Sequence, residues 1–212
     1  MFGSLGPWLE WIGVAVFALT GALVAADKDM DPFGFALLAT VTGVGGGTLR
    51  DLLLGIAPVF WVSDPTDILI CIAVSVAAFL AGESVQAASR DGARRRVVLI
   101  ADAIGLCVFA VTGTVRSLVH GASPLVAIVL GVMTATFGGI IRDLLAGHVP
   151  LVLRREIYVT AAALAALMVV ALDKSGVDPV IGACVAAGVG LTLRLLAILR
   201  GWSLPTFRRW IH

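Results

Sequence analysis

Long runs of apolar residues alternate with short polar segments along the whole chain. A helix needs about 20 mostly apolar residues to cross the hydrocarbon core of a membrane, and runs of roughly that length fill most of this sequence. Proline falls at the first turn of four runs, where its missing N–H costs nothing: Pro32, Pro65, Pro124 and Pro179. The pattern predicts membrane-spanning helices at 8–26, 33–55, 66–82, 97–118, 124–146, 157–172 and 179–199.

The composition agrees with a membrane protein. Of the 212 residues, 59% are hydrophobic and 14% are charged, and the mean hydropathy is +1.04. Soluble domains carry about 25% charged residues, so the composition excludes a soluble globule. The predicted helices leave too little chain for a separate soluble domain, and the net charge of +1 gives no sign of a nucleic-acid surface. We therefore expect a single membrane domain, 1–212, with no nucleic-acid partner.

Basic residues in the short loops indicate the orientation, because loops rich in lysine and arginine stay on the cytoplasmic side. With seven spans, the loop set that includes the N-terminus holds only Arg116 and Lys174. We expect an N-terminus outside, a C-terminus in the cytoplasm, and Arg116 as an anchor whose charge reaches the headgroups. The opposite, basic set is Lys28, Arg90, Arg94, Arg95, Arg96, Arg154, Arg155, Arg200, Arg208 and Arg209.

The chain repeats itself after 92 residues. Residues 12–58 align with 104–150 without a gap, and 18 of the 47 positions are identical. The identities include Gly, Pro, Thr, Arg and Asp, which chance similarity between apolar helices does not produce. Because each copy has three spans, an odd number, the second copy enters the membrane from the opposite side and is inverted relative to the first. The sequence thus predicts an all-α membrane fold of seven helices: two inverted three-helix repeats, 8–82 and 97–172, plus an additional helix at 179–199. Such repeats are common in proteins that move solutes.

The repeated motif is Gly-Gly-x-x-Arg-Asp-Leu-Leu-x-Gly, at 46–55 and again at 138–147. Consecutive glycines weaken a helix by about 1 kcal/mol each. They permit a kink or an unwound turn, whose freed carbonyls, with Thr42 or Thr134, could coordinate a dehydrated cation. Alternatively, small residues pack two membrane helices closely. Both interpretations stay open for Gly43, Gly45, Gly46, Gly47, Gly138 and Gly139.

Charged residues stand beside these glycines, where isolated charges in a membrane are expensive and usually functional. Adjacent residues on a helix do not face each other, so Arg50 is not expected to pair with Asp51. One alternative is that Arg50 reaches Asp143 crosswise or the freed carbonyls of its own kink, while Arg142 does the equivalent. The other is that both pairs anchor the helices at the interface. Glu10 and Asp102 are equivalent in the two copies, and acids near each mouth would concentrate cations. The charged candidates are Arg50, Asp51, Arg142, Asp143, Glu10 and Asp102.

The motifs of enzymes and cofactor sites are incomplete. The segment at 43–48 resembles a phosphate-binding loop, but it lacks the Gly-Lys-Ser/Thr ending and a preceding strand. His120, His148 and His212 lie in loops or the tail without paired acids, and no serine has a Gly-x-Ser-x-Gly context. We therefore expect no enzyme, no cofactor and no resident metal.

The chain resembles the prokaryotic TRIC family, the trimeric intracellular cation channels, a family grouped with small bacterial membrane proteins also described as glycine transporters. The resemblance rests on chain length, seven predicted spans, inverted repeats, and Gly-Gly-x-x-Arg-Asp in spans two and five. It implies a homotrimer in a bacterial plasma (inner) membrane, surrounded by lipids. Each protomer would have its own pathway for K+, with Na+ as an alternative ion, between the glycine-kinked spans two and five.

Carried over to this sequence, the kinks fall at 45–47 and 138–139. Phe137 stands where the first copy has Gly45, so the second kink is expected to be milder. Animal members have a Lys-Glu-Val stretch and bind a phosphoinositide, and span two here lacks that stretch. Two other functions stay open: a secondary transporter of a small zwitterion such as glycine, using the same helices, and a membrane scaffold without a pathway.

Overall fold

The computed structural model describes residues 7–82 and 93–205, and its long elements in these ranges are helices. Each predicted span coincides with one of them to within four residues at either end. In chain order the elements are α1 (Pro7–Asp27), α2 (Pro32–Leu53), α3 (Phe60–Ser63), α4 (Thr66–Leu80), α6 (Ala93–Val119), α7 (Pro124–Leu145), the 3-10 helix η2 (Leu151–Leu153), α8 (Val159–Lys174) and α9 (Pro179–Arg200).

Helices long and apolar enough to cross a membrane number five in the described ranges: α1, α2, α6, α7 and α9. The remaining long helices, α4 and α8, have 15 and 16 residues there. The prediction of an all-helical membrane fold is confirmed, while the count of seven crossings stays a prediction. Some residues that the orientation argument used lie outside the described ranges, namely Arg90, Arg208 and Arg209.

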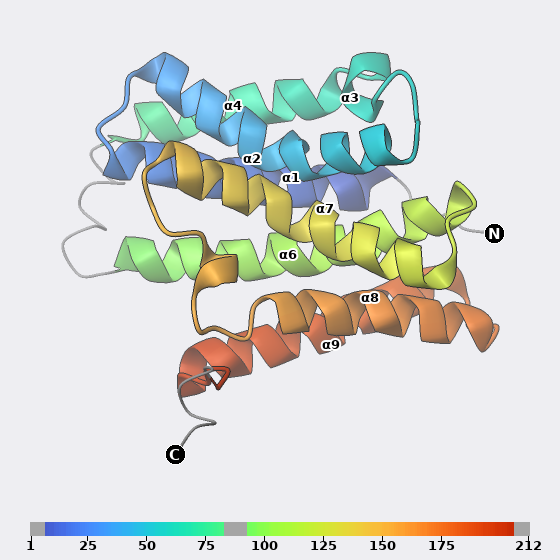
Figure 1. Cartoon of the computed structure of the whole chain (residues 1–212). Coiled ribbons are helices and arrows are strands. Elements are labelled where there is room, and N and C mark those ends of the chain that lie inside the picture. Colours follow the sequence, from blue (N-terminus) through green and yellow to red (C-terminus); the bar gives the residue numbers. More distant parts are fainter. Residues whose placement is uncertain (1–6, 83–92, 206–212) are drawn as a thin grey trace.

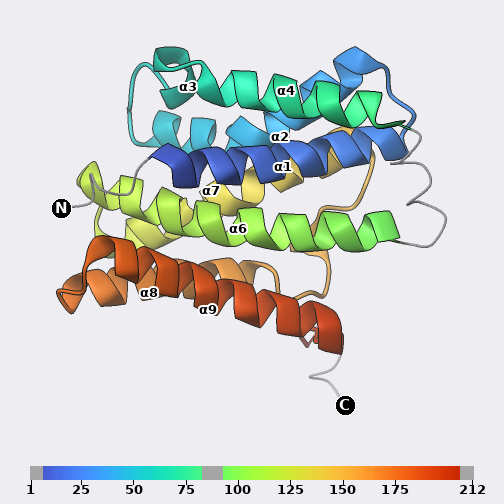
Figure 2. The ribbon, with the colours of Figure 1, turned by 180° about the vertical axis from the view of Figure 1, so that it is seen from behind.

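The central four helices of the bundle are α1, α2, α6 and α7 (Figures 1 and 2). On one side α4 packs against α1 and α2, and on the other side α8 packs against α6 and α7, with α9 against α6 and α8. In Figure 1, α2 and α7 run in opposite directions. Asp51 and Asp143, which lie near the C-terminal ends of these helices, are therefore at opposite ends of the bundle. These are called the Asp51 end and the Asp143 end below.

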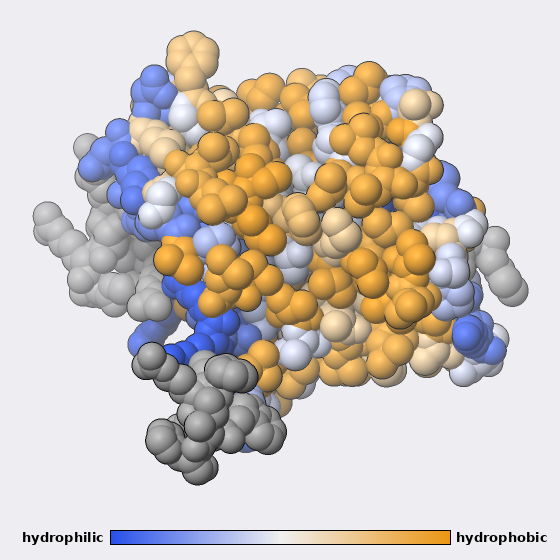
Figure 3. Space-filling view, viewed as in Figure 1, coloured by the Kyte–Doolittle hydropathy of each residue, from blue (hydrophilic) through white to orange (hydrophobic). Residues whose placement is uncertain are grey.

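Apolar residues cover the middle of the face in Figure 3, and hydrophilic residues gather towards the two ends of the helices. Large apolar side chains project from this bundle, among them Phe33, Leu125 and Leu199, which are 84%, 72% and 80% exposed. A contiguous apolar surface of this kind suits the hydrocarbon core of a bilayer.

The last glycine of each motif ends its helix. Gly55 and Gly147 both have a φ of 69°, in the left-handed region that glycine adopts without a steric penalty. The amide one residue further on donates to the carbonyl oxygen of Asp51 at 2.9 Å in the first copy, and to that of Asp143 at 2.7 Å in the second. This is the Schellman pattern, and it sets the same end point for α2 and α7.

Candidate functional site

Glycines lie at the contact where α2 crosses α7. A Cβ atom on Gly46 would collide with the carbonyl oxygen of Thr134, and a Cβ on Gly138 would collide with the carbonyl oxygen of Thr42. Gly45 faces α7 at the same contact. The two backbones therefore touch with no side chain between them, which is the close approach that small residues permit between membrane helices.

Other motif glycines make room for different neighbours. A Cβ on Gly43 would lie 2.7 Å from Sγ of Cys71 on α4, and a Cβ on Gly47 would lie 2.8 Å from the ring of Phe60 on α3. The glycines of α2 thus accommodate neighbours from three directions, so packing against α7 accounts for only some of them.

Both motif helices are continuous through their glycines, 43–47 and 138–139. The unwound turn that the sequence permitted is absent, because packing on several sides supplies the stability that glycine propensity does not. The hydroxyl groups of Thr42 and Thr134 donate to the carbonyl oxygens four residues earlier, at 2.5 and 2.6 Å. The structure therefore favours the packing interpretation of the glycines over freed carbonyls.

Each motif arginine pairs with the aspartate beside it. Nε of Arg50 donates to Oδ1 of Asp51 at 2.9 Å, and Nε of Arg142 donates to Oδ1 of Asp143 at 2.9 Å. The expectation that these neighbours do not pair is wrong, because a long arginine side chain folds back onto an adjacent short carboxylate. The crosswise pairing of Arg50 with Asp143 is also wrong, since they lie at opposite ends of the bundle (Figure 1).

The second oxygen of each motif aspartate holds the loop that follows. Oδ2 of Asp51 accepts the amide of Phe60, the first residue of α3, at 3.0 Å, and Oδ2 of Asp143 accepts the amide of Leu151, the first residue of η2, at 3.2 Å. Both segments lie between predicted spans, and no helix was expected in either of them. Both aspartates are therefore structural anchors as well as candidate pathway residues.

At the Asp143 end, Arg142 is bonded to several helices. Its Nη1 donates to Oγ1 of Thr20 on α1 at 2.9 Å and to Oδ1 of Asp102 on α6 at 2.8 Å. Asp102 is fully buried, so it is the counter-ion of Arg142 rather than an acid at an open mouth. Gly139 lies beside this cluster, where a Cβ would be 3.4 Å from the hydroxyl of Tyr158.

At the Asp51 end, two arginines share the acids. Arg116 lies 3.6 Å from Oε2 of Glu10 and 3.5 Å from Oδ2 of Asp51, whereas Arg50 is 3.9 Å from Glu10. Both guanidinium groups lie over the ring of Phe60, with Cζ at 5.8 and 5.7 Å from its centroid, a cation–π geometry. The expectation that Arg116 is a headgroup anchor is wrong, because its charge turns inward to this cluster.

Two further acids at the Asp51 end were missed from the sequence. Asp67, in the first turn of α4, is 6% exposed, and its Oδ1 has no hydrogen-bond partner among the described residues. In the loop before it, hydrogen bonds from the hydroxyl and amide of Thr66 lower the pKa of Asp64. The available signal was an acid next to Pro65 at the start of an apolar run. These carboxylates would favour cations near this end.

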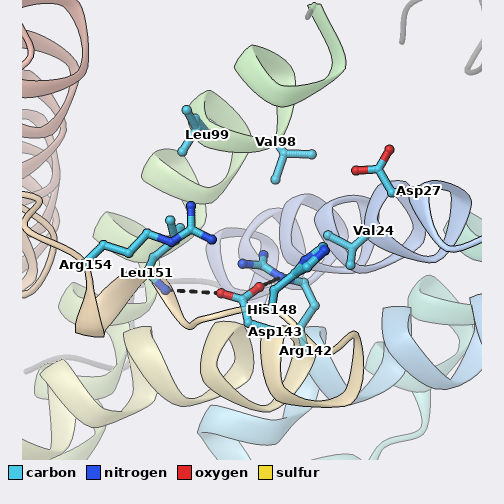
Figure 4. A pocket seen from close by; sticks show the side chains of 9 residues that line it. All are labelled: Val24, Asp27, Val98, Leu99, Arg142, Asp143, His148, Leu151 and Arg154. Carbon is cyan, nitrogen blue, oxygen red and sulfur yellow. Dashed lines mark hydrogen bonds and ion pairs between the residues drawn. The ribbon is translucent and has the colours of Figure 1, made fainter.

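A cavity of about 220 Å³ opens at the Asp143 end. Figure 4 shows the paired Arg142 and Asp143 at its base, with dashed lines for the hydrogen bonds that Asp143 accepts from Arg142 and from the amide of Leu151. A volume of this size holds several water molecules or a small solute. Its lining is Val24, Asp27, Val98, Leu99, Arg142, Asp143, His148, Leu151 and Arg154.

A third buried arginine, Arg194 on α9, belongs to a different cluster. Its Nη2 donates to Oε2 of Glu156 at 2.6 Å, its Nη1 donates to the carbonyl of Ile157 at 3.2 Å, and its Cζ lies 5.1 Å from the ring centroid of Tyr158. These contacts tie α9 to the segment before α8. We assign Arg194 a structural role.

Comparisons with known proteins agree with this architecture. The chain matches the family model described as "Glycine transporter" over residues 7–83 and 99–174. It is 39% identical to the UPF0126 inner membrane protein YadS of Escherichia coli, over 94% of this chain and 95% of that protein. It is 34% identical to the UPF0126 membrane protein YvgT of Bacillus subtilis, over 93% and 94% of the two chains.

Solved structures are similar over nearly the whole chain. A TRIC trimeric intracellular cation channel orthologue from Rhodobacter sphaeroides has 48% identity and a TM-score of 0.86, covering 92% of this chain and 97% of that chain. A prokaryotic TRIC channel solved in 0.5 M KCl has 29% identity and a TM-score of 0.83, covering 93% and 97%. The arrangement of helices around the α2–α7 crossing thus recurs in related membrane proteins.

Proposed function

The chain belongs to the glycine-transporter family of bacterial membrane proteins, with the UPF0126 proteins and the prokaryotic TRIC channels, and from this membership we propose that it is a cation channel of a bacterial inner membrane. The observation that carries the proposal is the α2–α7 crossing. Two backbones meet there through Gly46 and Gly138, and buried charged clusters stand beyond it towards either end of the bundle. A contact without interlocking side chains is a site that a small helix movement could open.

The pathway we propose lies between α2 and α7 in each protomer of a homotrimer and conducts K+, with Na+ as an alternative ion. Support for a cation as the transported ion and for a trimer comes from the 48% identical orthologue, which is described as a trimeric intracellular cation channel. Carboxylates at the Asp51 end add electrostatic support, because they would raise the local cation concentration. The proposed pathway residues are Glu10, Thr42, Gly43, Gly45, Gly46, Gly47, Arg50, Asp51, Asp102, Thr134, Gly138, Gly139, Arg142 and Asp143.

We also propose that 8–82 and 97–172 are inverted repeats, with 179–199 as an added helix. The packing of α4 on α1 and α2, which parallels that of α8 on α6 and α7, supports this division. The N-terminus would lie outside and the C-terminus in the cytoplasm. Support for this orientation comes from the basic residues Lys28, Arg154, Arg155 and Arg200, which border helices at the Asp143 end.

A second candidate is a carrier of a small zwitterion such as glycine. The description of the matching family model favours it, and the cavity of about 220 Å³ beside Arg142 and Asp143 has room for such a solute. A channel would offer a continuous water path in one conformation, whereas a carrier would show saturable exchange.

The deciding experiment is single-channel recording of the purified protein in a planar bilayer under a KCl gradient, with labelled glycine uptake into liposomes from the same preparation. Unitary currents that reverse near the K+ equilibrium potential would support the channel. A silent bilayer with saturable glycine uptake would replace it with the carrier.

Matched variants make the test specific to the crossing. Gly46→Leu should abolish the transport that the wild type shows. Gly188→Leu is the control, because Gly188 is exposed on α9 and no heavy atom lies within 4 Å of its Cβ position. Normal transport by the Gly46 variant would contradict a pathway at the crossing.

A further inference from the structure

Arg142 at the Asp143 end shows what a fully bonded motif arginine looks like. Its Nη1 donates to Oγ1 of Thr20 at 2.9 Å and to Oδ1 of Asp102 at 2.8 Å, which joins α7 to α1 and α6. Shifted by the repeat distance of 92 residues, the same three positions are Arg50, Thr112 and Glu10.

At the Asp51 end the equivalent bonds are not made. Nη1 of Arg50 and Oγ1 of Thr112 are both buried and lack a hydrogen-bond partner among the described residues. The distance from Nη2 of Arg50 to Oε1 of Glu10 is 3.9 Å, too long for a hydrogen bond. Leaving a buried donor and a buried acceptor unpaired is costly, so a second arrangement that pairs them would recover that cost.

Arg116 explains why the bonds are missing. It contacts Oε2 of Glu10 at 3.6 Å and Oδ2 of Asp51 at 3.5 Å, whereas the equivalent residue of the first copy is Val24. Thr112 lies four residues before Arg116 on α6 and therefore shares its helix face. Arg116 is thus a cation at a position where the Asp143 end has none. It draws Glu10 towards the face of α6 that also carries the unpaired hydroxyl of Thr112.

We propose that Arg116 is a positioning residue of the cation pathway. By holding Glu10, it keeps Arg50 from its second arrangement. When Glu10 leaves Arg116, Arg50 donates to Thr112 and Glu10 in the geometry that Arg142 has at the other end. This exchange clamps α2 to α1 and α6 and closes the Asp51 end. The effect on transport rests on the channel function proposed above, whereas the exchange itself does not.

Thermal melting in detergent tests the exchange without any transport assay. Thr112→Val keeps the volume and removes the hydroxyl, so it should leave the melting temperature of the wild type nearly unchanged. In an Arg116→Val background the same change should lower it by about 2 to 4 °C, because a hydrogen bond is then lost. Thr20→Val is the matched control and should lower the wild-type value by a similar amount, because Thr20 already accepts from Arg142.

Potassium flux from proteoliposomes tests the consequence. Arg116→Val should reduce the flux severalfold, Arg116→Lys should restore flux relative to the valine variant, and adding Thr112→Val to Arg116→Val should also recover flux. A purely structural role of Arg116 would not give this recovery.

Three results would overturn the proposal. The first is that Thr112→Val lowers the melting temperature of the wild type as much as Thr20→Val does. The second is that Thr112→Val leaves the melting temperature of the Arg116→Val variant unchanged, and the third is that Arg116→Val carries the same potassium flux as the wild type. If the wild type carries no K+ flux, the channel function fails, and the melting data alone support or overturn the exchange.

Discussion

Arg142 and Arg50 occupy the same place in two copies of one motif, yet their surroundings differ. Arg142 binds groups on α1 and α6 as well as its own Asp143. Arg50 has hydrogen bonds only to Asp51 among the described residues and shares its acids with Arg116. The motif therefore does not determine the network around its arginine; residues on neighbouring helices do.

The aromatic neighbours differ in the same way. At the Asp51 end, Phe60 offers only its ring to two guanidinium groups, whereas at the Asp143 end Tyr158 brings a hydroxyl close to Gly139. Both ends share the hydrogen bonds of the motif aspartate, but only the Asp143 end adds hydrogen bonds from its arginine to neighbouring helices, whereas the Asp51 end adds less directional charge and ring contacts. We expect the Asp143 end to be the more rigid of the two.

Replacing each motif arginine should give the largest difference in stability between the two ends. Arg142→Gln leaves Asp102 and Asp143 buried without a counter-charge, which costs about 3 to 5 kcal/mol. Arg50→Gln should cost clearly less, because Arg116 still contacts Glu10 and Asp51. Thermal melting in detergent measures both, with exposed Arg200→Gln as the control. Equal losses for the two motif arginines would contradict the proposed difference between the ends.

Alanine substitutions at the α2–α7 crossing should lower the stability of the protein by similar amounts in the two copies. Gly46→Ala and Gly138→Ala each place a methyl group against a carbonyl oxygen of the other helix, and overpacking of this kind costs about 1 to 3 kcal/mol. Gly188→Ala should instead stabilise α9 by up to about 1 kcal/mol, because alanine is the better helix former. Melting temperatures of the three variants check this, and tolerance of alanine at one crossing position alone would show that the contact is asymmetric.

Alanine at the next glycine of each motif should again change the stability of the two ends differently, by a smaller amount. A methyl group at Gly47 would lie 2.8 Å from the Phe60 ring, whereas one at Gly139 finds its nearest atom, the Tyr158 hydroxyl, at an ordinary 3.4 Å. We expect Gly47→Ala to lose about 1 kcal/mol and Gly139→Ala to be neutral or to gain up to about 1 kcal/mol. Denaturation midpoints of the two variants in the same detergent test this. A Gly47→Ala variant more stable than Gly139→Ala would show that the Phe60 ring moves aside at little cost.

The smallest effect should come from the partly exposed acid. Glu10→Gln removes a charge whose side chain is 22% exposed, so it should lower single-channel conductance by about twofold in dilute KCl and much less in 1 M KCl, where the screening length falls to about 3 Å. Conductance recorded over a series of KCl concentrations measures this. A loss that is independent of salt would indicate that Glu10 acts through its contact with Arg116 rather than through its field.

The helix positions could be predicted because apolar runs, prolines and the final motif glycines are local signals. The arginine partners could not. Thr20 and Arg142 are 122 residues apart, and nothing local marks them as neighbours. Arg116 was misjudged for the same reason, since its inward contacts depend on how α6 lies beside α1 and α2.

The glycines illustrate a different limit. An unwound turn and a close helix crossing both require the absence of a Cβ atom, so the sequence pattern is identical for the two. Only the positions of the carbonyl oxygens of Thr42 and Thr134 distinguish them. The Arg50 and Asp51 pairing was missed because the spacing rule describes where Cβ atoms point, whereas a long side chain can bend back.

The antiparallel crossing also sets how far a dehydrated ion would have to travel. The contact is centred near Val44 on α2 and Thr136 on α7, midway along the segments whose backbones touch. Arg50 and Arg142 each lie six residues further along, which at 1.5 Å per residue is about 9 Å on either side. The uncharged waist is therefore about 18 Å thick, against about 30 Å of hydrocarbon. Water that reached both charged clusters would thus shorten the dielectric barrier by more than a third.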